Sequence, residues 1–190
     1  MKTLYLHTPA EYGSDIDVRR LAARLGAVDC GIHSAQVTDV DSAIGLLAVV
    51  GDVEPGAIVV LDSLLGLAPP WSAESALRQL KTAAAASGVR LLVLSGNHQS
   101  GAACGPRSVL HVADMVVSVG LDESSTQARL LTAVKNRHAS APRYHVLVHS
   151  DCGLEPAKGD QAEVDTRGHE VSLLGSVAVP MAVIGGPDSA

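Results

Sequence analysis

The fold of this chain is decided by residues 56–63, which read GAIVVLDS. An unbroken apolar run closed by an acid is typical of a strand buried on both faces of a parallel sheet. The Ala-rich segment from Ser72 to Ser87 predicts a helix that stops at Gly88, and residues 89–94 predict the next buried strand. The centre of the chain therefore alternates strand and helix.

The same alternation extends toward the N-terminus. Residues 3–7 predict a short strand, residues 15–25 a helix, residues 31–35 a second strand and residues 39–50 a second helix. Repeated alternation favours parallel strands joined by right-handed crossovers. We therefore expect an α/β fold.

Composition agrees with this architecture. The 190 residues suit a single domain, and aromatic residues make up only 2% of them, with no Phe, so Ala, Val, Leu and Ile must fill the core. Three scattered cysteines argue against a disulfide framework, and no apolar run reaches the length of a membrane span. The expectation is a soluble, unprocessed, cytoplasmic protein.

The C-terminal half follows a different pattern. Residues 95–106 predict a Gly-rich loop, Pro106 starts a short helix, and residues 115–119 predict a strand. Residues 128–134 and 144–149 predict an antiparallel hairpin at the sheet edge, with a basic turn over residues 135–143. Residues 155–170 predict a linker, and the apolar run 171–184 is either a docked strand or a loosely held tail.

Asp62 is the first candidate for a functional carboxylate. An acid at the carboxyl end of a buried strand lies at the crevice where open α/β sheets bind ligands, and Ser63 shares that position. In nucleotide hydrolases of the P-loop class, an Asp there holds magnesium directly or through water. The alternative is that Asp62 caps the following turn.

Several short motifs occur in a fixed order along the chain. They are Asp62-Ser63, Leu91 to Leu94, Gly105-Pro106, His111 with Asp114, Lys135-Asn136-Arg137 and Gly153-Leu154. With them, residues 56–155 resemble the ATPase domain of the bacterial RadA (Sms) recombination family, a branch of the RecA-type ATPases. The resemblance implies a RecA-like three-layer sandwich with a mostly parallel sheet and an antiparallel edge hairpin. It divides the chain into a truncated core, 1–155, and a linker with a C-terminal strand or tail, 156–190.

The resemblance assigns roles to two segments. It implies that Lys135, Asn136 and Arg137 contact the nucleotide phosphates of a neighbouring subunit, as arginine fingers do. The family signature continues with Phe and Gly, whereas this chain continues with His138 and Ala139, and a solvated hairpin tip is the alternative. The resemblance also implies that the loop 95–106, together with Arg107, faces DNA. Its residues of interest are Gln99, which replaces a Lys of the family, Gly101, Gly105 and Arg107.

The phosphate-binding loop of the family has no counterpart here. No G-x-x-x-x-G-K-[ST] run occurs in the sequence, and in the family that loop precedes the segment corresponding to residues 3–5. In the family, a carboxylate that follows the strand corresponding to residues 3–5 orients the water that attacks the nucleotide. The acid found after that strand here, Glu11, is out of register for this role. The run 177–187, VAVPMAVIGGP, is similar to a strand that leads into a phosphate loop. The first P-loop strand and helix are thus expected to be missing or replaced by the C-terminal strand.

Three functions follow from these observations. The first is a non-catalytic RecA-type partner in assembly or DNA recombination and repair, forming oligomers with itself or with a RecA-like ATPase. The second is a nucleotide-binding ATPase with a permuted or separately supplied phosphate loop, in which Asp62 would hold magnesium with ATP. The third is a structural protein that reuses a decayed ATPase fold. Scattered histidines, including His145 and His149, lack an identifiable third ligand for a metal site.

Overall fold

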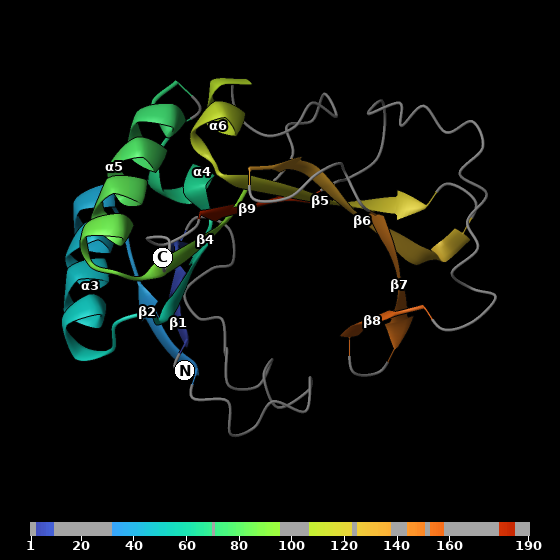
Figure 1. Cartoon of the computed structure of the whole chain (residues 1–190), viewed down its shortest axis with the longest axis horizontal. Coiled ribbons are helices and arrows are strands. Elements are labelled where there is room, and N and C mark those ends of the chain that lie inside the picture. Colours follow the sequence, from blue (N-terminus) through green and yellow to red (C-terminus); the bar gives the residue numbers. More distant parts are fainter. Residues whose placement is uncertain are drawn as a thin grey trace.

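The structure is a computed structural model that describes residues 3–9, 32–69, 71–95, 107–122, 125–137, 144–150, 153–157 and 179–184. These residues form one nine-stranded sheet in the order β2-β1-β3-β4-β9-β5-β6-β7-β8. The parallel half of the sheet consists of β2, β1, β3 and β4, and the antiparallel half consists of β9, β5, β6, β7 and β8 (Figure 1).

The parallel half confirms the predicted alternation. Its strands are β1 (Thr3–His7), β2 (Ile32–Gln36), β3 (Ile58–Asp62) and β4 (Arg90–Leu94), and all three of their pairings are parallel. Helix α3 (Val40–Val53) connects β2 to β3, and α5 (Ala73–Ala86) connects β3 to β4. A short helix, α4 (Leu64–Leu67), follows β3 and was not predicted.

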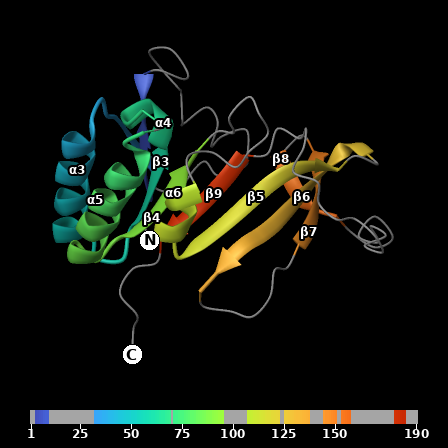
Figure 2. The same ribbon diagram turned by 90° about the horizontal axis from the view of Figure 1, so that it is seen from above.

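The core lies between this half of the sheet and its helices. Helices α3, α4 and α5 lie together beside one face of the sheet (Figures 1 and 2). Alternate residues of the strands point toward them, and the buried cluster consists of Ala, Val and Leu, as composition predicts. Its largest fully buried side chains include Leu6, Leu47, Leu61, Leu77, Leu80 and Leu91.

The antiparallel half differs from the expectation of a mostly parallel sheet. Helix α6 (Arg107–Val112) leads into β5 (Met115–Asp122), and β6 (Ser125–Asn136), β7 (Tyr144–Ser150) and β8 (Gly153–Pro156) follow. The predicted hairpin is confirmed as β6 and β7, but β8 and not β7 forms the sheet edge. Lys135 and Asn136 belong to β6 rather than to a turn, and Glu155 belongs to β8 rather than to a linker.

The C-terminal strand, β9 (Val179–Ile184), occupies an interior position of the sheet. It lies between β4 and β5 and runs antiparallel to both, so the prediction of a docked strand is confirmed for these residues. Ile184 pairs with Leu91 and Met181 pairs with Leu94. The carboxyl end of β9 therefore lies at the amino end of β4. This direction is wrong for a strand that leads into a phosphate loop near Asp62, which pairs with Leu94.

Other predictions concern residues outside the described ranges. They are the helix over 15–25, Glu11, the loop 96–106 with Gln99, Gly101 and Gly105, and residues 158–170 of the predicted linker. The described residues contain no helical layer on the second face of the sheet, and the three-layer sandwich stays a prediction. Among the helices in the described ranges, none combines the length and apolar character that crossing a membrane requires.

Candidate functional site

Buried polar residues gather at one edge of the parallel half. Among the side chains whose burial is described, the buried polar or charged ones are His7, Thr8, Asp62, Ser63 and Ser95. All five lie at the carboxyl ends of β1, β3 and β4, because His7 pairs with Asp62 and Asp62 pairs with Leu94. We call these five residues the carboxyl-edge site. This is the edge where open parallel sheets bind ligands.

Three of these residues form a row of hydroxyl groups. Thr8, Ser63 and Ser95 each follow directly after a strand, and the backbone N–H of Thr8 donates to the carbonyl of Asp62 at 2.9 Å. Within the described ranges, the hydroxyls of Thr8 and Ser95 have no hydrogen-bond partner, although these residues are only 0% and 8% exposed. Buried hydroxyls are nearly always bonded, so these two are exceptions among the described residues.

Asp62 occupies the predicted place at the carboxyl end of an interior strand. Strand alternation directs its side chain away from the helices, whereas Leu61 points into the core between sheet and helices. The Tyr5 hydroxyl donates a hydrogen bond to Oδ2 of Asp62, and the peptide bond between Asp62 and Ser63 is cis. The Asp62 carboxylate is therefore buried and held in place from the neighbouring strand.

The described side chains do not form a magnesium site by themselves. No group of three or more His, Cys, Asp or Glu side chains comes together in the part of the chain that the structure describes. The Tyr5 hydroxyl occupies one oxygen of the Asp62 carboxylate. His145 and His149 are exposed on β7. A cation at Asp62 would need further ligands, such as the phosphates of a nucleotide.

Helix α4 packs closely over the carboxyl-edge site. A Cβ atom built on Gly66 would collide with the Thr8 side chain, at both Oγ1 and Cβ. Only glycine permits this approach, which brings the α4 backbone against the unpartnered Thr8 hydroxyl. The close packing explains why this hydroxyl is inaccessible to bulk water.

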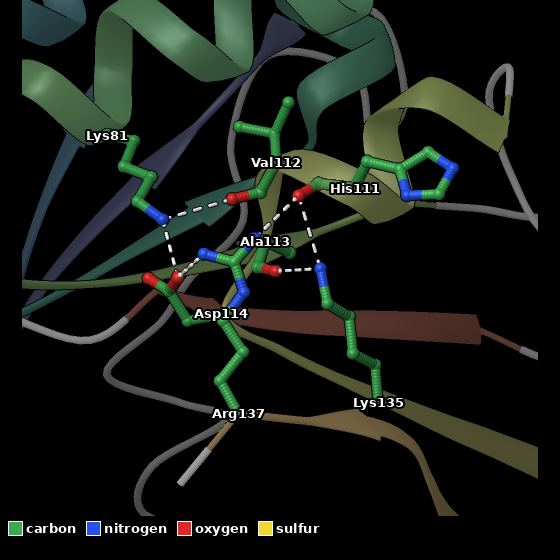
Figure 3. Close-up of polar contacts among 7 residues, drawn as sticks. All are labelled: Lys81, His111, Val112, Ala113, Asp114, Lys135 and Arg137. Atoms are coloured by element: carbon green, nitrogen blue, oxygen red, sulfur yellow. Dashed lines mark hydrogen bonds and ion pairs between the residues drawn. The ribbon is translucent and has the colours of Figure 1, made fainter.

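The Lys-Asn-Arg segment belongs to a second cluster, which we call the basic cluster and define as Lys81, Asp114, Lys135 and Arg137. Asp114 Oδ1 lies 2.6 Å from Lys81 Nζ and 2.9 Å from Arg137 Nη1 (Figure 3). Lys81 comes from α5, Lys135 from the end of β6, and Arg137 directly follows β6. Segments distant in sequence thus meet around one carboxylate.

The cations of this cluster also bind backbone carbonyls at the end of α6. Lys135 Nζ donates to the carbonyls of His111 at 3.1 Å and Ala113 at 2.7 Å. Arg137 Nη2 donates to His111 O at 3.1 Å, and Lys81 Nζ donates to Val112 O at 3.1 Å (Figure 3). The last carbonyls of a helix lack partners within the helix, and cations stabilise that end.

Electrostatics of the basic cluster favour an additional anion. Lys81, Lys135 and Arg137 gather at the end of α6, and the Asp114 carboxylate pairs with Lys81 and Arg137, so the cluster carries excess positive charge. Burial lowers the pKa of Lys135, and the neighbouring Arg137 lowers this pKa further, while Asp114 opposes the shift. The Arg137 side chain is 52% exposed, and within the described residues its hydrogen bonds to Asp114 and His111 engage two of the five N–H groups of a guanidinium.

The predicted residues are therefore only partly assembled. Lys135 and Arg137 come together with Asp114 and the His111 carbonyl, whereas Asn136 ends β6 opposite Met115. Arg107 begins α6. Sequence reasoning missed Lys81, the hydrogen bond from Tyr5 to Asp62, and Thr8 and Ser95 of the hydroxyl row, whereas Ser63 was predicted together with Asp62. The hydroxyl row had a readable signal, since Thr or Ser directly follows three of the apolar strands.

Comparison with known proteins adds no assignment to this geometry. No family model matches the chain, and no curated protein matches its sequence.

Proposed function

We propose that this chain is a non-catalytic, RecA-type protein that acts as a partner in assembly or in DNA recombination and repair. In this proposal the basic cluster binds the phosphates of a second molecule. The observation that carries it is the gathering of Lys81, Lys135 and Arg137 at the end of α6, where the Asp114 carboxylate pairs with Lys81 and Arg137. Excess positive charge in a fixed arrangement attracts phosphate groups.

Arg137 is the residue best suited to make the contact. Its side chain is half exposed, and one face of its guanidinium is fixed by Asp114 and the His111 carbonyl. A guanidinium that is already oriented loses less conformational freedom when it binds phosphate with its other N–H groups. Lys135, which donates to two carbonyls, supports the end of α6 behind it.

Two observations argue against catalysis by the chain alone. The sequence has no phosphate-loop motif, and β9 ends with Ile184 at the amino end of β4, away from Asp62. In addition, the described residues contain no group of three potential metal ligands. We therefore expect no ATP turnover by the purified protein, and we derive no step through magnesium.

Binding of short duplex DNA at increasing salt tests the proposal. Arg137→Ala should weaken binding and reduce the slope of log K against log salt by about 1, as expected for one lost phosphate contact. Arg78→Ala is the matched control, because Arg78 is also exposed and paired with one carboxylate, Glu74, but lies outside the cluster. Equal binding by wild type and Arg137→Ala would contradict a phosphate contact at this residue.

A second candidate function is nucleotide binding at the carboxyl-edge site. The observation that favours it is the unpartnered Ser95 hydroxyl, which directly follows β4, the strand that pairs with β3 and places Leu94 opposite Asp62. Calorimetric titration with Mg-ADP would show binding that Asp62→Asn weakens and Arg137→Ala leaves unchanged. Absence of binding to both DNA and nucleotide would favour the purely structural protein.

A further inference from the structure

Strand β2 forms one edge of the sheet, next to α3 (Figure 1). Within the ranges that the structure describes, β2 pairs only with β1, so one side of its backbone has no strand beside it. It reads IHSAQ and contains no Lys, Arg, Asp, Glu or Pro, the residues that usually discourage pairing at an edge. His33, Ser34 and Gln36 are exposed. This edge can therefore pair with an extended segment of another molecule.

A small cavity lies between β2 and α3. Its volume is about 220 Å³, and its lining includes Leu4 of β1, His33 of β2, and Val49 and Val53 of α3. Pockets for cofactors and drug-sized ligands usually measure about 300–1,000 Å³. Val49 and Val53 are 58% and 75% exposed, so apolar surface continues from the cavity to the solvent. The cavity therefore suits one apolar side chain.

Strand alternation would direct a side chain of a paired segment toward this cavity. Leu4 pairs with His33 and packs against the core on the helix side of the sheet. Paired residues of neighbouring strands point to the same face, so His33 also points to the helix side. A residue placed opposite His33 by a segment paired with β2 would do the same. The edge of β2 and the cavity thus form one surface, which we call the β2 groove.

The surroundings of the β2 groove are acidic. Residues 32–57, which form β2, α3 and their connections, contain four acidic residues, Asp39, Asp41, Asp52 and Glu54, but no Lys or Arg. Helix α3 connects the carboxyl end of β2 to the amino end of β3. Asp39 and Asp41 therefore lie near one end of the groove, and Asp52 and Glu54 near the other. Such a surface selects a basic partner, because like charges repel at an interface.

Neither edge strand of the chain itself suits this groove. A second β2 edge would bring the same acidic side chains together. Strand β8 carries Glu155 and Pro156, and residues 144–157 contain no Lys or Arg. A proline lacks the N–H group that a ladder requires, and a glutamate would meet further carboxylates. These edges leave a basic segment of a different protein as the matching occupant.

We propose that the β2 groove binds an extended basic segment of another protein. The segment adds a strand to β2 and places one large apolar side chain in the cavity beside Val49 and Val53. Lys or Arg two positions before and after that side chain point to the same face, toward the carboxylates at the two ends of the groove. Backbone pairing supplies affinity, and the cavity and the charges supply selectivity. The groove shares no residue with the basic cluster, so it can bind or fail to bind independently of phosphate.

Fluorescence anisotropy with labelled synthetic peptides tests the proposal. The probe is TKVLVKT, a peptide in which the Leu and both Lys side chains share one face of a strand. Wild type should bind this probe. The peptide TEVLVET has the wrong charge and TKVSVKT lacks the apolar side chain, so each should bind about tenfold more weakly.

Two N-methylated forms of the probe separate strand pairing from simple attraction. One form is methylated at the Leu and both Lys, and the other at the two Val. Successive N–H groups of a strand point to opposite sides, so only one of these two sets faces β2. One methylated form should therefore bind and the other should not. Equal binding of the two forms would contradict pairing with the β2 edge.

Variants of the protein locate the contact. Val49→Gln should weaken binding of TKVLVKT about tenfold, because it places a polar side chain in an apolar contact. Asp52→Asn should weaken binding and reduce its dependence on salt. Val134→Gln is the matched control, since Val134 is an exposed valine on β6, away from β2, and this variant should bind like wild type. Circular dichroism confirms that each variant is folded.

Failure of wild type to bind TKVLVKT would overturn the proposal. So would equal binding of TKVLVKT and TEVLVET, or unchanged binding by Val49→Gln. Light scattering adds a further result, namely self-association of wild type that Val49→Gln abolishes. That result would also overturn the proposal, because a second copy of the chain would then occupy the groove.

Discussion

The two halves of the sheet are stabilised in different ways. Every member of the buried apolar cluster belongs to β1, β3, β4, the helices or the connections between them, and none belongs to β5, β6, β7 or β8. In those four antiparallel strands, the buried apolar side chains among the described ones are Val116, Ala128 and Val146. The parallel half is therefore held by side-chain packing, and the antiparallel half depends more on its hydrogen-bonded ladders.

Paired leucine truncations provide the largest expected effect. Leu61→Ala in β3 removes a fully buried side chain and should lower the free energy of unfolding by about 2–5 kcal/mol. Leu131→Ala in β6 removes a partly exposed side chain and should cost about 1 kcal/mol. Urea denaturation followed by circular dichroism measures both. Similar losses for the two variants would show that the halves are packed alike.

The parallel half was also the more predictable one. A buried parallel strand needs apolar residues on both faces, so β3 and β4 are visible as continuous runs in the sequence. The run that forms β9 carries no information about its direction or its neighbours. Its antiparallel place between β4 and β5 depends on pairings over 60 or more residues of separation. The sequence therefore allowed the prediction that this strand leads into a phosphate loop near Asp62. That prediction was wrong, because β9 runs antiparallel to β4.

A site residue could be predicted from the sequence where its immediate sequence neighbours identify it. Asp62 was found because an acid at a strand end is a local signal. The Tyr5 contact with Asp62 depends on the register between β1 and β3, which a single sequence does not define. Lys81 joins Asp114 across 33 positions, so sequence reasoning had no reason to group them. The contacts of Lys135 with α6 were missed because its segment was predicted as a turn.

A pair of glycine substitutions tests how closely the helices of the parallel half pack. A Cβ atom built on Gly51 of α3 would collide with the backbone of Ser87, the C-cap of α5, whereas Gly45 of the same helix has open space around it. Gly51→Ala should destabilise the protein by about 1–3 kcal/mol. Gly45→Ala should stabilise it by about 0.5–1 kcal/mol, because alanine favours a helix. Thermal unfolding distinguishes them, and a neutral Gly51→Ala would contradict close contact between α3 and α5.

Asp114 tests how the two halves are joined. Its carboxylate connects Lys81 of α5, in the parallel half, to Arg137 after β6, in the antiparallel half. Asp114→Asn should lower the free energy of unfolding by about 1–2 kcal/mol, because both cations lose a charged partner and the exposure of Arg137 moderates the loss.

Glu74→Gln removes a carboxylate whose partner, Arg78, lies on the same helix, and this control should cost at most about 0.5 kcal/mol. Amide hydrogen exchange adds a local measurement, in which Asp114→Asn should speed exchange at the end of α6 and in the last residues of β6, while Glu74→Gln should not. If both variants behaved alike, the ion pairs of Asp114 would not contribute to holding the two halves together. The hydrogen bond from the Arg137 backbone N–H to the Asp114 carbonyl, at 3.0 Å, would then remain as a direct connection between these segments.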